Sequence, residues 1–299
     1  MDTVQRWVAE PPPDDLFEIA DRSLAGVSPR NPAQIREQIA LERLLTVSPS
    51  AANIVKPALV REVLPKVAGS PVKRMNAALV IPDYATRMGV LDFEEFPPSE
   101  EERIALIRFR LRKTVPFPID EAQIAYAIQV QEPKRFEVLA VAIARPILTD
   151  YELLFTDQGY RLGLVTPSSI ATLPLCFTSE PGLTLLAKAA GSVLSMLLLE
   201  QKRIRLVRCL DLAEGEEAQE TPHLDTVVSL LQQTVAYAED QIGARVTRIL
   251  LCGFGASTES LASVAEQEFG VSCNRVRSKR GAVSVYNAGI LGLLEQYAA

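Results

Sequence analysis

Residues Leu250–Ser257 read LLCGFGAS and place two glycines, Gly253 and Gly255, directly behind an apolar run. The residues that follow have apolar side chains at helical spacing. A strand, a glycine turn and a helix in this order often hold a nucleotide, because glycine lets the backbone approach a ligand closely. The same turn also forms wherever a strand must bend tightly into a helix. Either Gly253, Gly255 and Ala256 contact a nucleotide or they only shape the turn, and we favour the second interpretation.

The composition describes an acidic chain that is large enough for about two domains. It has 299 residues, of which 48% are hydrophobic and 23% are charged, and its net charge is -6. An acidic balance argues against nucleic-acid binding, which needs a basic surface. The four cysteines and the single histidine show no ligand spacing, so no metal site is expected. Isolated cysteines in apolar runs are typical of buried positions in a reducing compartment.

The chain repeats one theme, in which a β-meander is followed by helices. In the first half, LFEIAD and SLAGVS predict a hairpin around Asp21–Arg22. Residues 32–45 begin with a proline after an asparagine and have helical apolar spacing, which predicts a helix. In the second half, residues 183–212 predict a three-strand meander, and helices are expected over residues 222–242 and after the glycine turn.

The middle of the chain predicts two pairs of strands around one strongly marked helix. AALVIPD and RMGVLDF predict the first pair, and IAYAIQVQE and FEVLAVAIA predict the second. Between them, residues 99–115 predict a helix, in which Ser99 and Glu102 have the spacing of a capping box. Acidic residues begin this helix and basic residues end it, as the helix dipole favours.

Three stretches of the sequence carry a resemblance to a known family. They read ALVIPDYATRMGVLDFEEFP, LIRFRLRKTVPFPIDEAQIAYAIQ and EVLAVAIARPILTDYELLFTDQGYRLGLVTPSSIATLPL. They are similar to the PilM family, cytoplasmic actin-like proteins of type IV pilus assembly that are related to the cytoplasmic part of the type II secretion protein GspL. The resemblance extends from about Leu16 to Leu294. Together with the repeated halves, it implies an α/β fold of the actin/Hsp70-like (ribonuclease H-like) kind.

The resemblance also implies how the chain divides into domains. The first actin-like half is expected over residues 14–175, with a small α/β subdomain inserted at about residues 75–144. The second actin-like half is expected over residues 176–280. A C-terminal helix over residues 281–299 is expected to pack back on the first half.

The role of the family implies a scaffold rather than an enzyme. Its members lie under the inner membrane and hold the short cytoplasmic N-terminal tail of the membrane protein PilN, in a groove between the inserted subdomain and the first half. For this chain we expect a cytoplasmic protein that is peripheral to the inner membrane through its partner, in a pilus or a type II secretion-like machine. Contacts with the pilus motor ATPase and self-association stay open, and no nucleic-acid partner is expected.

The residues expected to hold the tail lie in LIRFRLRKTVPFP. Arg108 and Arg110 would contact acidic or main-chain groups of the partner, although basic residues at a helix end also complement its dipole. Val115 and Phe117 would form a groove wall or belong to the core. A groove of this kind takes a peptide by main-chain pairing and apolar pockets.

The nucleotide site of actin-like ATPases needs two phosphate hairpins besides the glycine turn, and both are altered here. In FEIADRS, Glu18 takes the place of an aspartate, and Asp21 takes the place of a small hydroxyl residue, where its carboxylate would repel a triphosphate. In LAKAAGS, Lys188 falls at or near the place of the metal-associated aspartate and cannot hold magnesium. We therefore expect no ATP hydrolysis and no cofactor, with a weak ATP contact at the glycine turn left open. The alternative function is an ATP-binding actin-like switch or a filament-forming ATPase.

Overall fold

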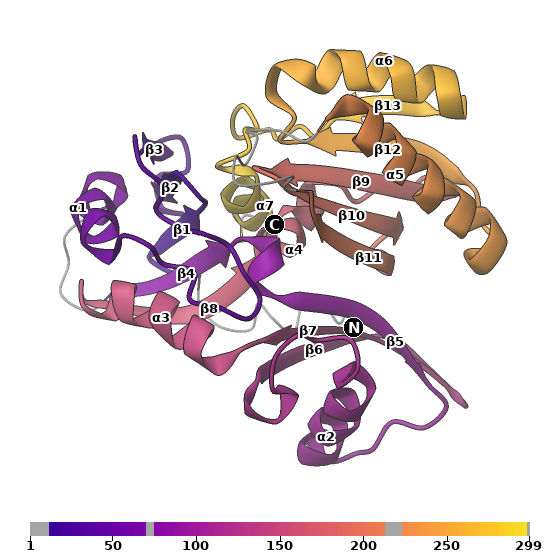
Figure 1. The fold of residues 1–299 in the computed structure, drawn as a ribbon, viewed down its shortest axis with the longest axis horizontal. Coiled ribbons are helices and arrows are strands. Elements are labelled where there is room, and N and C mark those ends of the chain that lie inside the picture. Colours follow the sequence, from indigo (N-terminus) through magenta and orange to yellow (C-terminus); the bar gives the residue numbers. More distant parts are fainter. Residues whose placement is uncertain (1–11, 70–74, 213–222, 298–299) are drawn as a thin grey trace.

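The first half of the protein is built on a five-stranded sheet (Figure 1). The computed structural model describes residues 12–69, 75–212 and 223–297. The strands of the first sheet are β1 (Asp15–Ile19), β2 (Ser23–Val27), β3 (Arg36–Ile39), β4 (Met75–Ile81) and β8 (Tyr160–Pro167). Their order is β3-β2-β1-β4-β8. β1, β2 and β3 form an antiparallel meander, and β4 and β8 continue the sheet in parallel with β1.

Both faces of this sheet are buried under helices. The helices are α1 (Pro57–Val67), α3 (Arg145–Thr156), α4 (Ser168–Thr172) and α7 (Ala288–Tyr297). α1 and α3 pack on the face that carries Phe17 and Leu79, whereas α4 and α7 pack on the face of Leu16 and Val80. Because successive strand residues point to opposite faces, burial on both sides explains the unbroken apolar run of β4. Glu18 is buried on the α7 side of β1.

The second half is built on a second five-stranded sheet. Its strands are β9 (Leu183–Ala190), β10 (Val193–Glu200), β11 (Arg203–Asp211), β12 (Val246–Cys252) and β13 (Ser272–Arg275), in the order β11-β10-β9-β12-β13. One face packs on α5 (Leu224–Tyr237) and α6 (Thr258–Phe269). The other face packs on Leu173, which follows α4, and on Ala288 of α7. The C-terminal helix α7 therefore lies between the two halves, as Figure 1 shows.

A third, three-stranded sheet forms the inserted subdomain. It contains β5 (Arg87–Phe93), β6 (Gln123–Glu132) and β7 (Arg135–Ile143), in the order β5-β7-β6, and carries the helix α2 (Glu100–Leu111). α2 covers the face of Val138 and Ala140. The opposite face, with Val90 and Leu139, packs against the second half. α2 begins after Ser99 as predicted, but the Ser99 side chain makes no capping hydrogen bond.

The helix predicted over residues 32–45 is wrong. Residues Arg36–Ile39 form the edge strand β3, and irregular chain follows. The N–H groups of Leu44 and Leu45 donate to the carbonyl of Asp21 in the β1–β2 turn, and both leucine side chains are fully buried. These tertiary contacts outweigh the local helical preference. Ile39 and Leu41 of the segment are exposed, so the helical spacing of its apolar residues does not mark one buried face.

Two boundaries differ from those expected. β4 pairs with β1 and β8, so Met75 belongs to the first half and the insertion begins after β4. The terminal helix begins at Ala288 rather than at residue 281, because the side-chain amide of Asn287 holds the preceding backbone in a turn. None of the helices in the described ranges is both long and apolar enough to cross a membrane.

Candidate functional site

Glu18, which is predicted to take the place of an aspartate in a phosphate hairpin, is fixed by hydrogen bonds within the protein. Its Oε1 accepts from Ser168 Oγ at 2.5 Å, and its Oε2 accepts from the N–H groups of Gly289 at 2.9 Å and Ile290 at 3.1 Å. Burial raises the pKa of Glu18, although Lys188 and these hydrogen bonds lower it. The carboxylate thus lies at the N-terminus of α7, where the helix dipole favours a negative charge. Its role in this structure is to hold α7.

Asp83, just after β4, joins the two halves directly. Its Oδ1 accepts from the N–H of Ser169 in α4 at 2.7 Å, and its Oδ2 accepts from Ser195 Oγ on β10 at 2.7 Å. Asp83 is 5% exposed, and Ser195 belongs to the second half. Hydrogen bonds to an ionised acceptor are the stronger kind, so this contact fixes the second sheet against the end of β4.

Lys188, on β9, brings a positive charge to the same place. It is 2% exposed, and in the sheet it pairs with Ser195 on β10 and with Cys252 on β12. Burial by itself would lower the pKa of Lys188, but the charges of Asp83 and Glu18 outweigh it and raise that pKa above its ordinary value. The lysine is therefore charged at neutral pH. We call Glu18, Asp83 and Lys188 the charge cluster.

The charge cluster does not fit a magnesium-bound nucleotide. Magnesium prefers carboxylate and water oxygens, whereas here the two carboxylates already accept hydrogen bonds from the protein and interact with the positive charge of Lys188. The β1–β2 and β9–β10 turns also face each other closely, since Asp21 Oδ2 would lie 3.8 Å from a Cβ built on Gly191. A triphosphate between these turns would meet the Asp21 carboxylate, a like charge.

The glycine turn is explained in part by packing. A Cβ on Gly253 would lie 2.0 Å from the carbonyl oxygen of Ala189, and Gly253 has a φ of +82°. Gly255, with a φ of +53°, has no heavy atom within 4 Å of its Cβ position, and Ala256 is exposed. Gly253 is therefore required by the close approach of β12 to β9. Contact of Gly255 or Ala256 with a nucleotide stays a prediction.

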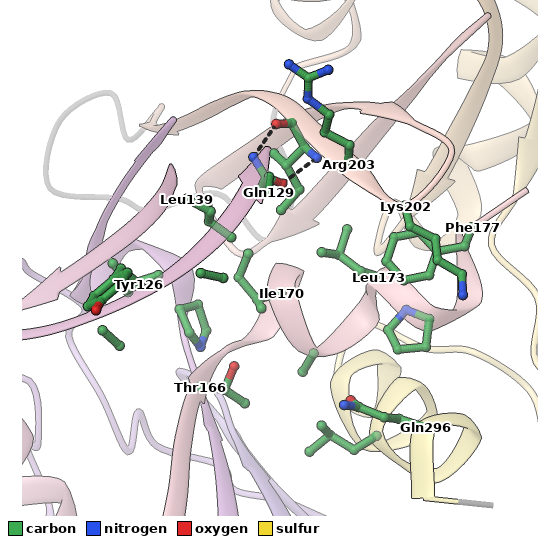
Figure 2. Close-up of a pocket in the computed structure, with 18 of the residues that line it drawn as sticks. Tyr126, Gln129, Leu139, Thr166, Ile170, Leu173, Phe177, Lys202, Arg203 and Gln296 are labelled. Carbon is green, nitrogen blue, oxygen red and sulfur yellow. Dashed lines mark hydrogen bonds between the residues drawn. The ribbon is translucent and has the colours of Figure 1, made fainter. Parts of the chain in front are cut away.

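A cavity of about 640 Å³ opens where the inserted sheet meets both halves (Figure 2). We call it the groove. It is lined by β6 and β7 of the inserted sheet, by β8, α4 and α7, and by the β10–β11 turn of the second half. Figure 2 shows Leu139, Ile170 and Leu173 pointing into it. The mostly apolar lining and the size are typical of a binding site.

The groove also exposes the edges of two sheets. β6 and β8 are end strands of their sheets, and consecutive residues of each, 125–129 and 164–167, line the groove. An end strand leaves backbone N–H and C=O groups along one edge to which another chain can pair. The groove therefore offers main-chain pairing as well as apolar contact.

Two contacts, which we call the clasp, fasten the second half to the rim of the groove. Gln129 Nε2 donates to the carbonyl of Ile204 at 2.8 Å, and Gln129 Oε1 accepts from the N–H of Ile204 at 2.8 Å (Figure 2). The β6–β7 register shifts at Gln129, and such a bulge re-aims a side chain. Beside it, the buried carboxylate of Glu137 accepts two hydrogen bonds from the guanidinium of Arg203.

The four residues predicted to hold a partner lie on the other side of the inserted sheet. Arg108 donates to a backbone carbonyl of its own subdomain, and the Arg110 guanidinium lies 5.3 Å from the ring centroid of Phe93. Val115 and Phe117 pack partly buried in the core under α2. None of the four lines the groove. Their contact with a partner stays a prediction.

Sequence reasoning missed three important residues of these sites. Asp83 carried a signal, because an acidic residue directly after a buried strand often has a specific partner. Gln129 carried none, since a bulge is not visible in an alternating strand sequence. Ile170 carried none either, because an apolar residue of a short helix does not reveal whether it faces a core or a cavity.

Two five-stranded sheets that each begin with an antiparallel meander, with helices between them and a small inserted subdomain, define the actin-like ATPase fold. The chain is similar over nearly its whole length to a chain of the PilM–PilN type IV pilus biogenesis complex, with a TM-score of 0.74, 16% identity, and coverage of 95% of this chain and 98% of that chain. The resemblance noted in the sequence is thus confirmed at the level of the fold.

Two further solved structures share this architecture. A Bacteroides thetaiotaomicron VPI-5482 protein with an actin-like ATPase fold and unknown function has a TM-score of 0.56 and 12% identity, with coverage of 96% of this chain and 97% of that chain. The ethanolamine utilization protein EutJ from Carboxydothermus hydrogenoformans has a TM-score of 0.51 and 8% identity, with coverage of 96% and 90%. No protein-family model and no curated protein sequence matches the chain.

The glycine turn generates the first prediction. Gly253→Ala should destabilise the protein by more than about 2 kcal/mol, because the new Cβ would clash with Ala189 at an unfavourable φ. Gly255→Ala has open space, so only the cost of its positive φ remains, about 1 kcal/mol. Urea unfolding of both variants measures the difference. Equal costs would contradict the packing explanation.

The charge cluster generates the second prediction. Lys188→Met should cost about 3–5 kcal/mol at pH 7, because it removes the cation beside two buried carboxylates. Without Lys188 the pKa of Glu18 rises further, and a carboxyl group with a raised pKa loses stability as pH rises. The cost should therefore shrink between pH 7 and pH 5. Urea unfolding at both pH values checks this, with the exposed Lys66→Met as control, and a pH-independent cost would contradict it.

Proposed function

We propose that this protein is a non-catalytic scaffold that binds the short cytoplasmic tail of a PilN-type membrane protein in the groove. The observation that carries the proposal is the groove itself, an apolar cavity of about 640 Å³ between the inserted subdomain and the first half. The fold similarity to a chain of the PilM–PilN complex supports it. In this proposal the protein works in the cytoplasm, held at the inner membrane through its partner, in a type IV pilus or a type II secretion-like machine.

The geometry of the groove suggests how the tail is held. An extended peptide pairs its backbone with the edge of β6 or β8, and alternate side chains enter the apolar space around Ile170 and Leu173. Main-chain pairing supplies much of the affinity, and the apolar pockets select the side chains. The surface at the end of α2, with Arg108 and Arg110, is the other candidate for this partner.

The charge cluster supports the non-catalytic part of the proposal. The buried carboxylates are committed to α4, α7 and Ser195, and Lys188 supplies the positive charge between the halves. The two halves then need no bound cofactor to keep their relative position. The competing function, an ATP-dependent switch or filament-forming ATPase, needs a phosphate cradle that Asp21 and Lys188 oppose.

Calorimetric titration of the full chain with a synthetic peptide of the tail tests the proposal. The wild type should bind, and Ile170→Asn should weaken binding by about tenfold or more, because it places an amide in the apolar groove. Arg110→Ala, on the opposite side of the inserted sheet, should bind as the wild type does. Loss of binding in Arg110→Ala alone would transfer the site to α2. No binding by a folded wild type would overturn the proposal.

A further inference from the structure

The groove is not a site of the first half alone. The β10–β11 turn of the second half supplies one of its walls, through residues 200–204. Figure 2 shows Lys202 in this wall, near Phe177 and Leu173. The shape of the groove therefore depends on how the second half sits against the inserted sheet.

The clasp holds this wall in place. Ile204 lies on β11, an end strand of the second sheet, and the Gln129 amide satisfies both its N–H and its carbonyl, as a neighbouring strand would. The Glu137 carboxylate is 4% exposed and is matched by the guanidinium of Arg203. Such partly buried hydrogen bonds depend strongly on distance and angle.

Two helices connect this rim to the charge cluster. In α4, Ser168 and Ser169 bond the carboxylates of the cluster, and Ile170 lines the groove. In α7, the first turn bonds Glu18, and Leu293 lines the groove. On the other side, β10 carries Ser195 of the interdomain bond near its start and ends at the groove wall. The cluster and the groove are therefore the two ends of one interdomain joint.

We infer that Gln129 is a positioning residue, which sets the second half as the closing wall of the groove and so couples peptide binding there to the joint between the halves. The inference rests on the proposed function of the groove. This coupling is reciprocal. A peptide that binds the closed groove stabilises the joint, and a loosened joint lowers the affinity for the peptide by the same factor. In this protein the joint between the halves would then control their relative position, as a bound nucleotide does in an ATP-dependent switch.

The test compares Gln129→Met with Gln131→Met. Methionine keeps the shape of Gln129 but removes both hydrogen bonds to Ile204 and a longer one, at 3.3 Å, to Glu137 Oε1. Gln131 is an exposed residue of the same strand. Gln129→Met should lower the affinity for the tail peptide about five- to tenfold, which lies in the range of typical allosteric couplings. Gln131→Met should bind as the wild type does. Calorimetry with the full chain measures both, and circular dichroism checks that each variant is folded.

Amide hydrogen exchange distinguishes coupling through Gln129 from a purely structural role of this residue. In the wild type, the peptide should slow exchange in residues 200–204 and also in β9 around Lys188, whereas in Gln129→Met it should slow exchange only in β6, β8 and α4. Wild-type affinity and wild-type exchange in Gln129→Met would overturn the coupling and leave the proposed function standing. No binding by the wild type would overturn both.

Discussion

The buried charges of Glu18, Asp83 and Lys188, with the bonds of Asp83 to Ser169 and Ser195, are the interactions on which the arrangement of the two halves depends. A charge in a protein interior is tolerated only with partners of opposite sign and with hydrogen bonds that replace water. Here each half supplies one sign. Glu18 lies in the first sheet and Asp83 just after its strand β4, whereas Lys188 lies in the second sheet. Because neither half can leave its charges buried alone, the cluster favours one relative position of the halves.

The same requirement organises the helices between the sheets. Glu18 bonds the first turn of α7, and Asp83 bonds the first turn of α4. Both helices then run from the cluster to the groove, where their later residues form part of its lining. The buried carboxylates of the cluster thus hold the helices between the sheets. The apolar groove, with two sheet edges open, is the place where the molecule offers contacts to something else.

Much of the architecture could be predicted from the sequence, because the decisive patterns were local. The apolar strand of β4, the meander of β9–β11 and the turn at Gly253 each depend on neighbouring residues, and the structure contains them. The helix predicted over residues 32–45 is wrong because the conformation of this segment depends on hydrogen bonds to the carbonyl of Asp21, which lies in another part of the chain. Lys188 departs from the family pattern in the sequence, but Asp83, whose charge raises the pKa of Lys188, is 105 residues away. Gln129 depends on a bulge and on β11, neither of which a single sequence reveals.

We propose that the two halves are held together by the protein's own charges rather than by a nucleotide. Thermal unfolding with millimolar Mg-ATP, compared with Mg²⁺ alone at equal ionic strength, tests it most directly. A ligand at 100 times its Kd stabilises the folded protein by about 2.7 kcal/mol. Each kcal/mol raises Tm by about 2–4 °C in a protein of about 150–250 residues, somewhat smaller than this one. The account predicts a Tm that Mg-ATP leaves unchanged. A rise of several degrees that follows the Mg-ATP concentration would contradict it.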